Sequence, residues 1–77
     1  MSKKSQIKKA IDECEREIRA YELKIERSQN ALVRALLKGT KPSPEDEQYF
    51  TVFSDLIDQE REKLRGLYAE LNNLNNQ

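Results

Sequence analysis

The chain has 77 residues, of which 36% are charged, and its 14 Lys and Arg balance its 14 Asp and Glu. It contains one cysteine and no histidine, which excludes an internal disulfide, a zinc site built on Cys and His, and a histidine-based triad. Apolar runs are too short for a membrane span or a signal-peptide core. We therefore expect a cytoplasmic protein with one domain at most, spanning residues 1–77.

The first half of the chain predicts one long amphipathic helix over residues 5–38. Its seam side chains follow one another at steps of four and three residues, the spacing of a coiled coil: Ile7, Ile11, Cys14, Ile18, Tyr21, Ile25, Ser28, Leu32 and Ala35. Ser2 and Ser5 are both suitable N-caps. Gly39 suits the left-handed position that ends many helices, and Pro42 prevents the helix from continuing.

A turn at 39–43 leads into a second predicted helix over residues 44–74. Ser43 is a good N-cap, Pro44 suits the first helical position, and three carboxylates follow in the first turn. The same heptad spacing returns in this helix at Phe50, Phe53, Ile57, Glu60, Leu64, Leu67, Leu71 and Leu74.

The two repeats predict an all-α fold, an antiparallel two-helix coiled-coil hairpin. The two seams face each other along their whole length when the residue numbers of each facing pair add up to 85. This register places Cys14 opposite Leu71 and Ile25 opposite Glu60. Residues 1–41 carry a net charge of +5 and residues 42–77 a net charge of −5, so the two arms attract each other along their flanks.

A hairpin of two helices buries each seam from one side only, and a second apolar strip lies near the turn. Two explanations fit Tyr49, Val52 and Leu56: they cover the hairpin's own turn, or they bind another helix. We favour binding, with two hairpins forming a four-helix bundle as a homodimer. The residues expected to bind a partner are Leu36, Leu37, Tyr49, Val52, Phe53 and Leu56.

Glu60 is the only charged residue in either seam, and Cys14 is the only cysteine. We expect Glu60 to form a structural polar layer that sets the register, satisfied by Tyr21, Lys24 or Ser28. Partial exposure of Glu60 and a binding or catalytic carboxylate are the alternatives. Cys14 is expected to act as a small buried side chain, with an interchain disulfide near a dimer axis as the alternative.

Glycine-rich phosphate loops and nucleophile–base pairs are absent from the sequence, so we predict that the chain is not an enzyme and uses no cofactor or metal. The favoured function is a non-enzymatic protein–protein interaction or oligomerisation module whose partner is a second copy or another helical protein. The alternative is a small regulator of nucleic-acid metabolism. It would bind RNA or DNA through the terminal lysines Lys3, Lys4, Lys8 and Lys9, or act on a polymerase through the acidic turn Glu45, Asp46 and Glu47. A third hypothesis is that the chain is part of a longer coiled-coil protein.

Overall fold

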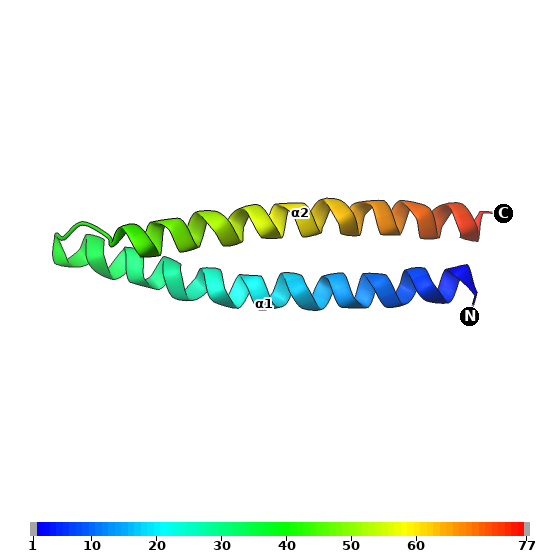
Figure 1. The fold of residues 1–77 in the computed structure, drawn as a ribbon, viewed down its shortest axis with the longest axis horizontal. Helices are drawn as coiled ribbons and strands as arrows, with labels where there is room; N and C mark the ends of the chain where they lie inside the picture. The colour runs from blue at the N-terminus through cyan, green and yellow to red at the C-terminus, as the bar shows by residue number, and fades with distance from the viewer. Residues whose placement is uncertain (1, 77) are drawn as a thin grey trace.

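The computed structural model describes residues 2–76 and consists of two helices, α1 (Lys3–Lys38) and α2 (Pro44–Asn75). They lie side by side and antiparallel, with both termini at the same end of the molecule (Figure 1). The molecule measures 58 × 16 × 16 Å. The predicted all-α hairpin is confirmed.

Local hydrogen bonds explain where each helix begins and ends. The Oγ of Ser2 accepts the amide of Ser5 at 3.1 Å, so α1 begins two residues earlier than expected. The Oγ of Ser43 accepts the amide of Asp46 at 3.0 Å, at the positive end of α2, where carboxylates are favoured. Gly39 has a φ of 70° and ends α1 in the left-handed conformation that glycine adopts without strain.

Burial along the seam is uneven between the two helices. The seam residues of the described chain that are less than a tenth exposed are Ile7, Ile11, Cys14, Ile18, Ser28 and Ile57. Five of these six belong to α1, whereas the leucines of the α2 seam are only half-buried. A two-helix hairpin therefore leaves part of its apolar surface open to solvent.

Four side-chain contacts fix the register of the two helices. They join Cys14 to Glu60, Tyr21 to Phe53, Lys24 to Phe53, and Glu15 to Tyr68. The residue numbers of these pairs sum to 74, 74, 77 and 83, so the predicted sum of 85 is wrong. A sum near 78 fits them, which is one heptad away and keeps the two seams facing each other.

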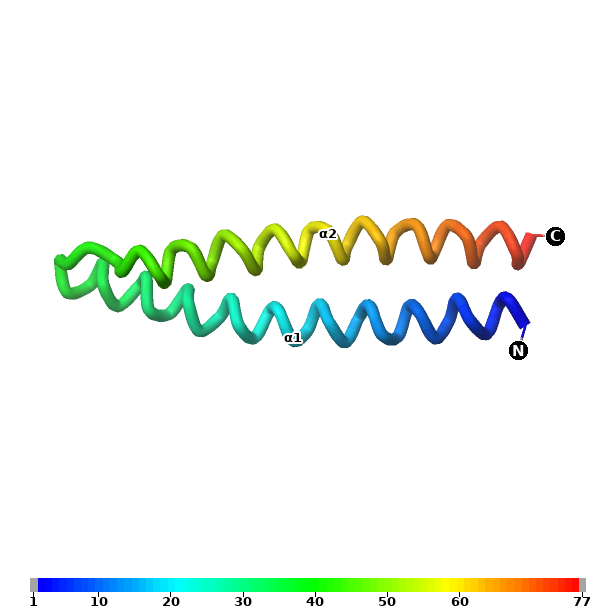
Figure 2. The backbone as a smooth tube through the Cα atoms, in the orientation of Figure 1, coloured from blue at the N-terminus to red at the C-terminus, as the bar shows by residue number. Residues whose placement is uncertain are grey.

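The path of the loop explains this shift. The loop runs back along α1, so the last turns of α1 extend past the first turn of α2 (Figures 1 and 2). The amide of Thr40 donates to the carbonyl of Ala35 at 2.9 Å, which holds the start of the loop against the helix end. The prediction assumed a turn that places the two helix ends level. On the overhanging end, Leu36 and Leu37 are 71% and 82% exposed.

Candidate protein-binding surface

The residues predicted to bind a partner lie in two places. Tyr49, Val52, Phe53 and Leu56 follow one another along α2 at steps of three, one and three residues, which places them on one stripe of the helix. Leu36 and Leu37 instead lie on the overhanging end of α1, where successive residues point about 100° apart. The stripe on α2 is therefore the more coherent candidate surface.

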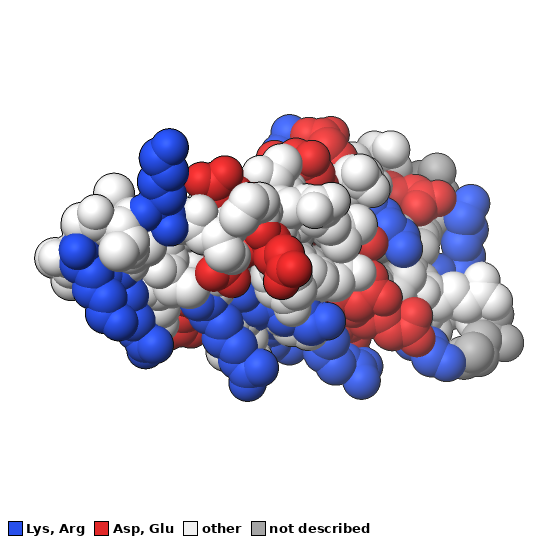
Figure 3. Space-filling view, turned by 60° about the vertical axis from the view of Figure 1, so that its left-hand side comes forward, with Lys and Arg blue, Asp and Glu red and all other residues white. Residues whose placement is uncertain are grey.

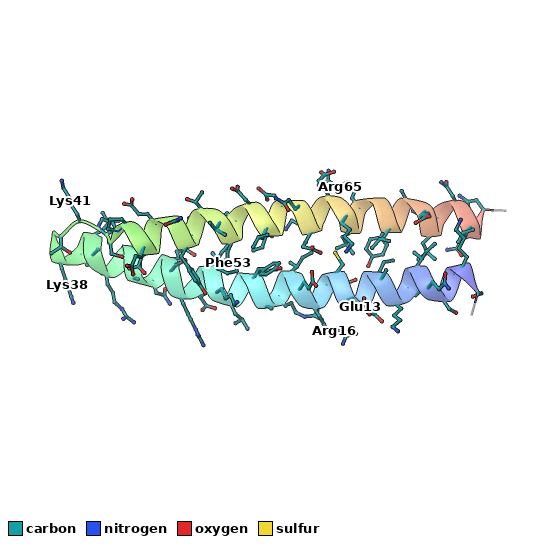
Figure 4. All side chains as sticks on the ribbon, viewed as in Figure 1. Glu13, Arg16, Lys38, Lys41, Phe53 and Arg65 are labelled. Atoms are coloured by element: carbon teal, nitrogen blue, oxygen red, sulfur yellow. The ribbon has the colours of Figure 1, made fainter. Side chains whose placement is uncertain are left out.

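An aromatic cluster holds this stripe in place. Phe53 lies between the two helices (Figure 4), and its ring centroid is 5.6 Å from that of Tyr21 on α1 and 4.5 Å from that of Tyr49. The Nζ of Lys24 lies 4.9 Å from the Phe53 centroid, within range for a cation–π interaction. Tyr49 and Val52 nevertheless remain 41% and 44% exposed, so the cluster orders an apolar surface without covering it.

Two shallow hollows show which side of the hairpin this surface faces. One, of about 220 Å³, is lined on α2 by Glu45, Gln48, Tyr49, Val52 and Phe53. The other, of about 180 Å³, is lined by Arg27 and Ser28 of α1 and by Asp46 and Tyr49 of α2. Because Arg27 and Tyr49 border the same hollow, they lie on one side of the hairpin. We call this side the Tyr49 face and define it by Lys24, Arg27, Tyr49, Val52 and Leu56.

Basic side chains flank the Tyr49 face on α1. Arg34 follows Arg27 by seven residues and Lys38 follows Arg34 by four, so helical spacing places all three on one exposed stripe. Figure 3 shows Lys and Arg side chains in a row along the lower edge of the molecule, where α1 lies. Sequence analysis missed the stripe formed by Arg27, Arg34 and Lys38, although the steps of three, seven and four from Lys24 to Lys38 indicate it.

The opposite side of the hairpin has a different character. It carries a hollow of about 310 Å³ lined by Glu22, Ile25, Glu26, Gln29, Ser54, Ile57, Asp58 and Arg61. Three of these side chains are carboxylates and one is basic. The two sides of the hairpin near the loop are therefore electrostatically distinct, and the Tyr49 face combines exposed apolar side chains with basic ones.

Glu60 and Cys14 form a polar layer within the seam. The Sγ of Cys14 donates to the Oε2 of Glu60 at 3.1 Å and lies 3.2 Å from the Glu60 carbonyl. The partner of Glu60 is therefore Cys14, not the predicted Tyr21, Lys24 or Ser28, because the register differs by a heptad. Burial, followed by the bond to the Glu60 carboxylate, raises the pKa of the Cys14 thiol to about 11.

A second polar contact joins the helices on the outer surface. The Oη of Tyr68 donates to the Oε1 of Glu15 at 2.9 Å, and this bond raises the pKa of Tyr68. The heptad spacing places Tyr68 off the seam. Its bond to Glu15 could not be predicted from the sequence, because it depends on which residues of α1 lie level with the last turns of α2.

The residues of the alternative nucleic-acid function are exposed, with the exception of Asp46. Lys3, Lys4, Lys8 and Lys9 lie on the first turns of α1. Glu45 and Glu47 are exposed on the first turn of α2, whereas Asp46 is half-buried beside Arg27 and Tyr49. Their charge near the start of α2 is the arrangement that a helix N-terminus favours in any protein.

Among residues 2–76, no group of three or more His, Cys, Asp or Glu side chains is arranged to hold a metal ion. Neither α1 nor α2, over the same residues, has a stretch apolar enough to cross a membrane. The geometry defines the chain as a long antiparallel coiled-coil hairpin with one apolar, basic-flanked face. Comparison with protein-family models, curated proteins and solved structures found no match for the chain.

Proposed function

We propose that the chain is a non-enzymatic protein–protein interaction module that binds a helical partner through the Tyr49 face. The observation that supports this proposal is the exposure of Tyr49 and Val52 on a stripe that the Phe53 cluster keeps ordered. Preordered apolar side chains with a polar rim are typical of protein-binding surfaces, because little conformational entropy is lost when they are covered.

The geometry of the stripe favours a helix as the partner. Tyr49, Val52 and Leu56 repeat at steps of three and four residues, which matches the ridge that a second helix packs against. Farther toward the termini, the leucines of the α2 seam are also only half-buried. A further helix on this side would cover Tyr49, Val52 and Leu56, which the two helices of the hairpin leave partly or largely exposed.

Variants at matched exposed positions test the proposal. Val52→Asp places a charge in the stripe, whereas Leu23→Asp places the same charge on the outer side of α1, where Leu23 is 63% exposed. We expect association, measured by solution mass and by capture on immobilised protein, to be lost in Val52→Asp and retained in Leu23→Asp. Circular dichroism should show equal helix content in both. Equal association of the two variants would refute the Tyr49 face as the binding surface.

A further inference from the structure

Building on the proposed function, we infer that the partner is a second copy of this chain, stacked on the first through the Tyr49 faces with both loops at the same end. In this arrangement a two-fold axis runs parallel to the helices, and α1 of each copy lies over α2 of the other. The interface is isologous, so it closes as a dimer and leaves no free copy of the Tyr49 face. The result is an antiparallel four-helix bundle.

Charge complementarity near the loop supports this arrangement. On the Tyr49 face, α1 presents Lys24, Arg27, Arg34 and Lys38, whereas α2 begins with Glu45 and Asp46. With a register sum near 78, Arg34 lies level with Pro44 of its own chain and, by the two-fold axis, level with Pro44 of the second copy. Arg34 of one copy therefore meets the acidic first turn of α2 of the other.

Farther from the loop, an acidic residue of α1 and a basic residue of α2 replace the basic and acidic residues found near the loop. Glu17 of α1 and Lys63 of α2 are both near Cys14, since both act electrostatically on its thiol. In the proposed stack, α1 of one copy places Glu17 within about two residues of the level of Lys63 on the other copy. This pair would add one point of attraction farther from the loop.

Side-chain size is complementary as well. The exposed Ala20 and half-buried Ala31 share the stripe of α1 that borders Arg27. With a register sum near 78, they would lie close to the level of the larger Leu56 and Tyr49 of the second copy, respectively. Small residues opposite large ones allow two helices to approach closely. A second copy thus supplies both the charges and the shape that the Tyr49 face requires.

The reverse stacking, with loops at opposite ends, is less favourable. It would place Arg34 and Lys38 of one copy beside the lysines at the start of α1 in the other, including Lys3, Lys4 and Lys9. Like charges brought together across an interface oppose association. The clusters of like charge at both ends of the stack therefore disfavour the arrangement with loops at opposite ends.

Sedimentation equilibrium over a concentration series tests the stoichiometry. We expect a dimer of about 18 kDa, twice the 9.0 kDa chain. Val52→Asp should weaken the dimer by about tenfold, because it replaces an apolar contact with a desolvated carboxylate that Lys24 and Arg27 of the second copy compensate only in part, whereas Leu23→Asp should leave it within about twofold. A wild-type monomer at all concentrations would overturn the inference of a second copy. Binding of another helical protein that Val52→Asp abolishes would still support the proposed function.

Charge reversal tests which helix faces which. Arg34→Glu should weaken the dimer by about tenfold, and adding Glu45→Arg in the same chain should recover most of the loss, because each copy then offers the reversed pair. Absence of recovery would overturn the stacking of α1 over α2.

Spin labels at Thr40→Cys, in a Cys14→Ala background, give an independent measure of the arrangement. Loops at the same end should place the two labels within about 30 Å, given helix spacings of 8–10 Å and the added reach of the labels. Labels separated by nearly the 58 Å length of the molecule would overturn the proposed arrangement while leaving a dimer through the Tyr49 face intact.

Discussion

Raising the pH should weaken the hairpin through the titration of Cys14. The thiol is 2% exposed, and its pKa is raised from 9.0 to about 11 by burial and by the bond to the Glu60 carboxylate. In the unfolded chain the thiol returns to its ordinary pKa. Between these two values the unfolded chain releases the proton while the folded chain keeps it, so increasing pH favours unfolding.

The size of the effect follows from the two pKa values. Each tenfold change in acidity corresponds to about 1.4 kcal/mol, so a rise from 9.0 to about 11 is worth at most about 2.7 kcal/mol. This stability is fully present below about pH 8 and is lost progressively as the pH rises toward 11. For a small two-helix domain, a loss of this size is a large fraction of the total free energy of unfolding.

Urea unfolding followed by circular dichroism, at pH values from 7 to 11 under reducing conditions, provides the assay. Cys14→Ala is the control, because it lacks the thiol but keeps every tyrosine and lysine that titrates in the same range. We expect the wild-type free energy of unfolding to fall more steeply than that of Cys14→Ala above pH 8. Parallel curves for the two proteins would refute the linkage between Cys14 and stability.

Three further predictions concern stability in urea unfolding at pH 7. Gly66→Ala should raise the free energy of unfolding by about 1 kcal/mol, since a Cβ there meets nothing within 4 Å, whereas Gly39→Ala should lower it by about 1 kcal/mol because φ is 70°. Equal effects of the two glycine changes on the free energy of unfolding would contradict the different backbone roles given to Gly66 and Gly39. Ser43→Ala should cost about 1 kcal/mol through loss of the bond to the Asp46 amide, and no change in midpoint would exclude that cap. Glu60→Leu should stabilise the hairpin by about 1 kcal/mol, and a lowered midpoint would indicate that the polar layer adds stability.

Features encoded within a few residues of one another could be predicted from the sequence. The start of α2 at Pro44, the end of α1 at Lys38 and the left-handed Gly39 all follow from local capping and backbone preferences. The seam residues follow from the heptad spacing, and Cys14 and Ile57 are indeed buried. These signals depend little on how the helices are placed relative to each other.

The register could not be obtained in the same way. A heptad repeat looks nearly the same after a shift of seven residues, so the seams alone allow several registers. The path of the loop decides among them, and the sequence of residues 39–43 fits both a level turn and one that runs back along α1. The partner of Glu60, the bond from Tyr68 to Glu15 and the overhang of Leu36 and Leu37 all depend on that choice.

A hairpin joined at one end has a built-in order of assembly. The chain length between partners grows from the loop toward the termini, reaching 46 residues for Cys14 and Glu60 and 53 for Glu15 and Tyr68. Because loop closure costs more entropy as the loop lengthens, the Tyr21–Phe53 contact is expected to form before these two. Once it has formed, each further pair of contacting residues orders only the few residues that separate it from the previous pair. Loop-closure entropy therefore favours assembly from the loop toward the termini, in which the aromatic cluster fixes the alignment before Cys14 meets Glu60.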